Sequence, residues 1–315
     1  MKRVLITDDC HPSLTEGLER MGYACDFEPD ITLAEVRARI GAYHGLIINS
    51  KILVDQPLLD AAAQLEFVGR MGSGMEIVDR VYAAKKNVAV LSSPEGNNNA
   101  VAEHALGMLL ALSNNLLRAD RELRRREWRR EANRGVELRG RTLGIVGFGY
   151  TGSQLARKLA GFEMRVLAHD RYKTGFSKEM PWVEACDIEE IRREADIVSL
   201  HLPLTEETRH YVNRDFIAGC KPGFILINTA RGQCVDTYAL ADALEAGQCG
   251  GACLDVFENE KPETYSPAEI ALYHRLFALD QVILSPHIAG WTVESRKLLA
   301  EILVEKIAAV LAKKA

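Results

Sequence analysis

Short runs of aliphatic and β-branched residues alternate along the chain with segments of helical period, a pattern typical of an α/β protein with mostly parallel sheets. In the first hundred residues the pattern predicts buried strands at 4–7, 45–48, 67–69 and 88–91, with crossover helices at 33–40 and 57–63. A second α/β series begins at Leu143 and continues to about Leu284. The pattern therefore predicts two α/β units.

Two longer helices are predicted by apolar residues at helical spacing, one over 100–117 and one over 292–311 with a cap at Thr292. We expect the first helix to continue into the basic stretch 118–134, where Asp120 stands four residues before Arg124 and Glu122 four before Arg126. Because Trp128 is the one aromatic residue of this stretch, a solvated or subunit-facing helix is a better interpretation than a nucleic-acid site.

Composition narrows the class of protein. The length of 315 residues fits two domains, and a net charge of −5 gives no general attraction to nucleic acid or anionic membranes. The N-terminal apolar run is too short for a signal peptide, and 105–117 is too short to span a bilayer. Seven scattered cysteines without a C-x-x-C pair predict reduced thiols rather than a disulfide frame or metal site. We therefore expect a cytoplasmic protein without metal, nucleic-acid or membrane partners.

One glycine-rich turn has the position of a dinucleotide-binding loop. It follows the strand-like LGIV, precedes a helix-like run, and reads Gly147-Phe148-Gly149-Tyr150-Thr151-Gly152. The next predicted strand ends in Asp170, where an acid can accept both ribose hydroxyls and would repel a 2′-phosphate, so NAD is favoured over NADP. Arg171 beside it leaves NADP use open. A second loop, 69–74, lacks a following acid and is either an anion-binding or a structural turn.

Three ionisable residues follow strands of the second series: Arg231, Glu260 and His287. Ligands of open α/β sheets bind outside the carboxyl ends of the strands. Reduction of a 2-oxo acid needs a cation for the carboxylate, a proton donor for the carbonyl oxygen, and a group that keeps the donor charged. Arginine, histidine and glutamate meet these needs in that order.

The chain also contains the motifs GRMGSGMEIVD, NNNAVAEHALGMLLAL, LRGRTLGIVGFGYTGSQLA, ADIVSLHLPLTEETRHYVN, CKPGFILINTARGQCVDTYAL, CLDVFENE and VILSPHIAGWT. With these motifs it resembles the D-isomer-specific 2-hydroxyacid dehydrogenases, especially the phosphoglycerate-dehydrogenase-like branch. The resemblance implies that Arg231 binds the substrate carboxylate, that His287 is the general acid or base, and that Glu260 favours its imidazolium form.

The resemblance also implies the binding residues. Asp255 would hold the nicotinamide carboxamide, and the backbone would line NAD at Tyr150, Thr151, Leu202, Pro203, Thr229, Ala230 and Gly290. The N–H groups of Ser73 and Gly74 would hold the substrate carboxylate. Asn49-Ser50-Lys51 stands where phosphoglycerate enzymes often carry an Arg-Ser pair, so Ser50 and Lys51 are substrate candidates but do not decide whether the substrate is phosphorylated. The stretch between Glu260 and His287 is longer than expected, with an added helix at 268–279.

These observations predict two Rossmann-like or flavodoxin-like domains, with an NAD-binding domain at 100–284 inserted into a substrate domain formed by 1–99 and 285–315. The expected function is NAD-dependent hydride transfer involving a small D-2-hydroxy acid, with 3-phosphoglycerate as the leading substrate. Hydroxypyruvate or glyoxylate reduction is the alternative, and a non-catalytic, corepressor-like NAD sensor is the alternative from another class. A homodimer is expected, without the regulatory extension of some phosphoglycerate dehydrogenases.

Overall fold

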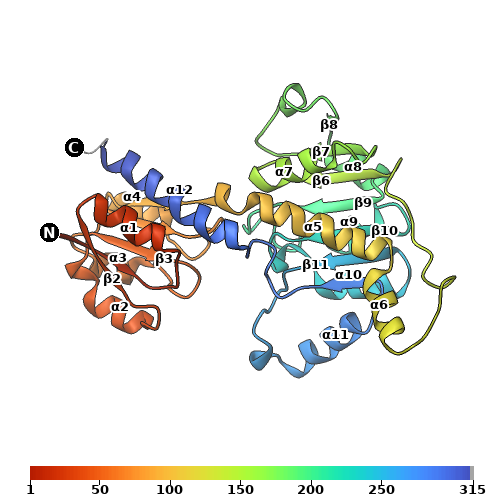
Figure 1. The fold of residues 1–315 in the computed structure, drawn as a ribbon, viewed down its shortest axis with the longest axis horizontal. Coiled ribbons are helices and arrows are strands. Elements are labelled where there is room, and N and C mark those ends of the chain that lie inside the picture. The colour runs from red at the N-terminus through yellow and green to blue at the C-terminus, as the bar shows by residue number, and fades with distance from the viewer. Residues whose placement is uncertain (313–315) are drawn as a thin grey trace. The chain divides into compact units, whose positions relative to one another are not determined.

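The structure is a computed structural model that describes residues 1–312, and the chain divides into two compact units. The first contains Met1–Asn98 together with the C-terminal segment from Trp291, and the second contains Asn99–Gly290 (Figure 1). Within residues 1–312, every helix is too short or too polar to cross a bilayer. The same residues hold no cluster of histidine, cysteine and acidic side chains suited to a metal ion.

The first unit is built on a five-stranded parallel sheet with the order β2-β1-β3-β4-β5. This order is that of the flavodoxin-like fold, which has a topological switch point between β1 and β3. The strands are β1 (Lys2–Ile6), β2 (Tyr23–Phe27), β3 (Gly45–Ile48), β4 (Phe67–Arg70) and β5 (Ala89–Ser92).

The C-terminal helix completes the core of this unit. Ala300, Leu303 and Ile307 of α12 are buried with side chains of β1, β3, β4 and α1. The predicted cap is confirmed, because Ser295 N donates to Thr292 Oγ1 at 3.1 Å. The helices of the unit are α1 (Pro12–Arg20), α2 (Leu33–Arg39), η1 (Ile40–Ala42), α3 (Gln56–Ala61), α4 (Arg80–Lys85), η2 (Pro94–Gly96) and α12 (Val293–Ala312).

The second unit is built on a seven-stranded parallel sheet with the order β12-β11-β10-β9-β6-β7-β8. Counted from β6, this is the Rossmann order with one further strand, and the order reverses between β6 and β9. The predicted fold class is confirmed. The strands are β6 (Thr142–Val146), β7 (Arg165–His169), β8 (Val183–Ala185), β9 (Ile197–Leu200), β10 (Phe224–Asn228), β11 (Cys249–Leu254) and β12 (Val282–Leu284).

The helices of the second unit include the added segment expected before His287, which is α11. They are α5 (Asn98–Ser113), α6 (Leu116–Arg124), α7 (Tyr150–Leu159), η3 (Phe176–Lys178), α8 (Ile188–Glu194), α9 (Arg214–Ala218), η4 (Gly232–Cys234), α10 (Thr237–Glu245), η5 (Pro262–Thr264) and α11 (Pro267–Phe277).

The prediction of one long helix that continues into the basic stretch up to residue 134 is wrong. The helix breaks at Asn115, whose φ of 54° is left-handed, and α6 ends at Arg124. Asp120 pairs with Arg124 at 2.8 Å as predicted, but Arg126 lies beyond the helix with a φ of 64°. Glu122 instead accepts a hydrogen bond from Asn133 Nδ2 at 2.5 Å, so its carboxylate anchors the following loop.

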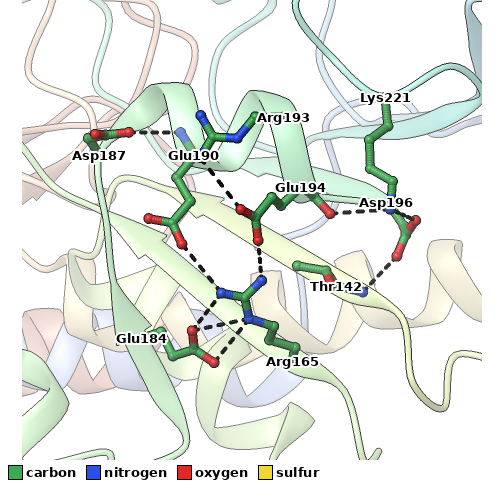
Figure 2. A network of polar contacts seen from close by, with 9 residues as sticks. All are labelled: Thr142, Arg165, Glu184, Asp187, Glu190, Arg193, Glu194, Asp196 and Lys221. Carbon is green, nitrogen blue, oxygen red and sulfur yellow. Dashed lines mark hydrogen bonds and ion pairs between the residues drawn. The ribbon is translucent and has the colours of Figure 1, made fainter.

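Ion pairs and hydrogen bonds join neighbouring elements of the second unit at the amino ends of its strands (Figure 2). Arg165, the first residue of β7, donates to Glu184 of β8 at 2.8 Å and also pairs with Glu194 of α8. Asp196, just before β9, accepts from Thr142 N at 2.8 Å and from Lys221 Nζ at 2.6 Å. The glycine turn lies at the other ends of these strands. We therefore assign these charged groups a structural role and not a role in ligand binding.

Packing of α12 gives a direct stability prediction. Leu303→Ala removes a side chain with 0% exposure from the core and should lower the free energy of unfolding by about 2–5 kcal/mol. Leu298→Ala on the same helix is the matched control, because Leu298 is 43% exposed. Urea unfolding followed by circular dichroism measures both, and an equal loss at the two positions would contradict the packing described.

Candidate active site

The glycine turn occupies the switch point of the second sheet. Gly147 follows β6 with a φ of 95°, and a Cβ there would lie 2.5 Å from the carbonyl oxygen of His201, which follows β9. A Cβ on Gly152 would lie 2.2 Å from the carbonyl oxygen of Gly147, so close packing of α7 on the turn requires glycine. A Cβ on Gly149 would meet no described heavy atom within 4 Å. Folding requires the first and third glycines, whereas the second leaves room for a ligand at the start of α7.

Backbone hydrogen bonds hold the carboxylate of Asp170 beside this turn. Its carboxylate accepts from Phe148 N at 2.7 Å and from Tyr172 N and Lys173 N at 2.9 Å. Burial raises the pKa of Asp170, but these backbone donors outweigh burial and hold the pKa below its ordinary value. Next to it, the Arg171 guanidinium pairs with Glu207. The end of β7 therefore presents an ionised carboxylate, and the neighbouring cation is engaged by an acid.

The next two strands bring further predicted residues to the same edge. Leu202 and Pro203 follow β9, while Thr229 and Ala230 follow β10. Asn228, the last residue of β10, accepts from Ala230 N at 3.1 Å and donates to the Arg231 carbonyl at 2.9 Å. Among the residues described, the buried hydroxyl of Thr229 has no hydrogen-bond partner. A buried hydroxyl without a partner at the carboxyl-end edge of the sheet fits a polar ligand there.

Asp255, directly after β11, holds the loop that carries His287. One carboxylate oxygen accepts from Ser285 Oγ at 2.6 Å and Ile288 N at 2.9 Å, and the other accepts from Ala289 N at 2.9 Å. The Asp255 carbonyl accepts from His287 N at 2.7 Å. These bonds explain why 285–290 pack with the second unit, which ends at Gly290 and not at Leu284 as the sequence pattern indicated.

His287, Glu260 and Arg231 are brought together by this loop and its neighbours. His287 Nδ1 lies 2.8 Å from Glu260 Oε2. Burial raises the pKa of Glu260, but the hydrogen bond and charge of His287, together with Phe257 N and the charge of Arg231, hold that pKa below its ordinary value. With Nδ1 facing the carboxylate, Nε2 is the nitrogen available to exchange a proton with a ligand.

Backbone packing explains how Arg231 comes near Glu260. A Cβ on Gly232 would lie 1.9 Å from the backbone of Phe257, so the two loops touch through their main chains. Arg231 Nη1 donates to the Ala230 carbonyl at 2.6 Å. The second unit therefore holds a guanidinium, a carboxylate and an imidazole at the carboxyl end of its sheet, which are the groups needed for proton transfer to an oxo acid.

The candidate substrate residues of the first unit lie after two neighbouring strands. Ser50 and Lys51 follow β3, and Ser73 and Gly74 follow β4 by a short turn. The ammonium group of Lys51 donates to the Pro29 carbonyl. These four residues share the carboxyl-end edge of the first sheet.

Sequence reasoning did not predict the structural roles of two polar residues that organise the second unit, Asn228 and Ser285. Asn228 fixes the turn before Arg231, and Ser285 bonds the carboxylate that holds the His287 loop. A usable signal was their position, since each is the polar residue that ends or follows a buried strand.

Comparisons with known proteins identify the family of the second unit. Residues 106–289 match the family model of the D-isomer specific 2-hydroxyacid dehydrogenase, NAD binding domain, which confirms the predicted cofactor. D-3-phosphoglycerate dehydrogenase of Methanocaldococcus jannaschii is 34% identical over 99% of this chain and 58% of its own length. Hydroxypyruvate reductase of Thermotoga maritima is 37% identical over 83% of each chain.

A solved structure is similar along its whole length. D-lactate dehydrogenase from Aquifex aeolicus, complexed with NAD and lactic acid, has a TM-score of 0.85 at 28% identity, covering 99% of this chain and 96% of that one. The chain spans 58% of the length of the phosphoglycerate dehydrogenase of Methanocaldococcus jannaschii. The chain belongs to the D-isomer specific 2-hydroxyacid dehydrogenase family.

Proposed function

We propose that this protein is an NAD-dependent oxidoreductase that transfers hydride between nicotinamide and a small D-2-hydroxy acid or 2-oxo acid. The observation that carries the proposal is the 2.8 Å contact between His287 and Glu260, in the same unit as Arg231 and the glycine turn. The names of the relatives support phosphoglycerate as the leading substrate and hydroxypyruvate as the alternative, with glyoxylate in the same class.

The chain's own residues supply binding and proton transfer. Arg231 binds the substrate carboxylate through its guanidinium. His287 donates a proton from Nε2 to the carbonyl oxygen during reduction and removes it during oxidation. Glu260 stabilises the imidazolium through Nδ1. Bound NAD supplies or accepts the hydride.

The cofactor site fits the residues present. Gly149 leaves space at the start of α7, Asp170 offers carboxylate oxygens to the ribose hydroxyls, and Thr229 offers an unpartnered hydroxyl. We assign the second unit to NAD, with Tyr150, Thr151, Leu202, Pro203, Ala230 and Gly290 along it. The resemblance gives the nicotinamide carboxamide to Asp255, which directly follows β11 at the same edge of the sheet.

We assign the first unit to the substrate. Ser73 and Gly74 would hold the carboxylate through backbone N–H groups, and Ser50 would contribute a hydroxyl. For Lys51 to bind a substrate phosphate, its ammonium would exchange the Pro29 carbonyl for the phosphate. A phosphate is a stronger acceptor for an ammonium than a neutral carbonyl, so this exchange is favourable.

A substrate panel tests the function directly. NADH oxidation should be measured with glyoxylate, hydroxypyruvate, pyruvate and phosphohydroxypyruvate. At least one acid should turn over, and His287→Ala should lower kcat by at least about 10²-fold with little change in NADH affinity. Full turnover by His287→Ala would contradict its role. NADH binding without turnover of any acid would favour the non-catalytic, corepressor-like NAD sensor instead.

The His287–Glu260 pair predicts a pH effect of definite sign. Because the pKa of Glu260 lies below its ordinary value, this carboxylate stays ionised near neutral pH and favours the imidazolium. Reduction needs the protonated ring, so it should decline as pH rises. Glu260→Gln should move this decline to lower pH, because the imidazolium loses its charged partner. Profiles of kcat/KM from about pH 6 to 9 measure this, and superimposable profiles would contradict the pairing.

The selectivity for NADH over NADPH tests the proposed role of Asp170 in binding the ribose hydroxyls. Asp170→Asn should narrow the preference for NADH over NADPH by at least about fivefold, since two unit charges 4 Å apart in water repel by about 1 kcal/mol. The ratio of kcat/KM for the two cofactors is the measurement. Glu206→Gln, at an exposed acid on another loop, is the control. An unchanged ratio in Asp170→Asn would remove the proposed ribose role.

The quaternary state and location are further proposals. Large apolar side chains are exposed along α6 and the segment after it: Leu116, Leu117, Leu123, Trp128 and Val136. Such a surface is typical of an interface, and we assign it to a second copy in a homodimer. Sedimentation measures this state directly. All seven cysteines are free thiols, which supports a reducing, cytoplasmic location.

A further inference from the structure

His104 is a polar residue of the second unit that none of the assigned roles uses. It lies on α5, with its side chain 25% exposed, and its Nε2 is 2.8 Å from Ser285 Oγ. Ser285 Oγ in turn lies 2.6 Å from Asp255 Oδ1. His104 Nε2 also lies 3.6 Å from Asp255 Oδ1, which is longer than a hydrogen bond, so the hydrogen-bonded route from this helix to the loop that carries His287 runs through the Ser285 hydroxyl.

The direction of these hydrogen bonds follows from the number of available protons. The two oxygens of Asp255 accept backbone N–H groups from Ile288 and Ala289, and an aspartate carboxylate offers acceptors only. The single hydroxyl proton of Ser285 therefore goes to Asp255. Ser285 Oγ must then accept from His104, so His104 Nε2 carries a proton.

The hydrogen bonds from His104 through Ser285 and Asp255 end at the backbone on either side of His287. Ile288 N and Ala289 N donate to the Asp255 carboxylate, and His287 N donates to the Asp255 carbonyl. His287 itself has a φ of 55°, a left-handed conformation that a non-glycine residue keeps only when its surroundings hold it. The carboxylate orientation that makes these bonds is the one that Ser285 and His104 support.

We propose that His104 is a positioning residue for the reaction: through Ser285 and Asp255 it fixes the loop 285–290 in the conformation that presents His287. The inference rests on the proposed function for the catalytic role of His287, but not for the loop conformation itself. A purely packing role for the His104 ring is the competing explanation. The two differ because a positioning role requires an N–H donor at the place of Nε2, whereas packing requires only the ring's volume.

Amide hydrogen exchange tests the loop without relying on turnover. His104→Ala should raise exchange of the peptide containing Ile288 and Ala289, and His104→Gln should restore protection, because the glutamine amide can place an N–H near the position of Nε2. His274→Ala on α11, where the side chain is exposed, is the matched control for removing a helical histidine. Unchanged exchange in His104→Ala would overturn the proposal, and so would equal loss of protection in the alanine and glutamine variants.

Kinetics then separate positioning from general loss of structure. With the 2-oxo acid that the wild type reduces fastest, His104→Ala should lower kcat by about tenfold, less than the 10²-fold that a 1 Å misplacement can cost. NADH affinity, measured by fluorescence titration, should change less than about twofold. His104→Gln should recover most of the lost kcat. A loss of kcat that glutamine does not rescue, or a loss explained by NADH affinity, would contradict the role.

A double-mutant cycle tests the route through the hydroxyl. Because His104 acts on Asp255 through Ser285, His104→Ala should have little further effect in the Ser285→Ala background. Additive losses of kcat would show that the two residues act independently and would overturn the relay. If the wild type reduces no oxo acid, the proposed function fails, while exchange and the same cycle in loop protection still decide whether His104 positions the loop.

Discussion

A carboxylate with 1% exposure, such as that of Asp255, is stable only when hydrogen-bond donors replace the water it has lost. Three donors of the loop 285–290 satisfy it, one hydroxyl and two backbone N–H groups. Because a carboxylate without these donors would be costly to bury, the loop and Asp255 hold each other in place. This mutual constraint fixes the backbone of His287 and thereby its distance to Glu260.

The same edge of the sheet supplies every other component of the second unit's site. Parallel strands end on one side, so the residues after β6, β7, β9, β10 and β11 lie together although they are far apart in sequence. The charge pairs around Arg165 and Asp196 lie at the other ends of the strands. The fold thus separates groups that tie the sheet together from groups exposed to a ligand. His287 and Glu260 belong to the groups exposed to a ligand, because both side chains are partly accessible to solvent.

The sequence pattern predicted most of this arrangement, because buried parallel strands and glycine turns leave strong local signals. It missed β2, a strand at the edge of the first sheet whose mixed sequence YACDF lacks a continuous apolar run. It also extended the basic helix too far, since the left-handed backbone of Asn115 is a local choice that helical periodicity does not encode. The roles of Asn228 and Ser285 could not be predicted, because their hydrogen-bond partners come near only in the folded sheet. The catalytic roles of Arg231, Glu260 and His287 and the cofactor contacts remain predictions, although the geometry of the second unit supports them.

A crystal structure of the protein with NAD and a D-2-hydroxy acid tests most directly whether the carboxyl-end edge of the second sheet binds the cofactor and His287 faces the substrate. The pyrophosphate should lie at the start of α7 beside Gly149, the ribose hydroxyls on Asp170, and the substrate hydroxyl within hydrogen-bond distance of His287 Nε2. The substrate carboxylate should contact Arg231. A cofactor bound away from the glycine turn, or a substrate whose hydroxyl faces a group other than His287, would contradict this arrangement.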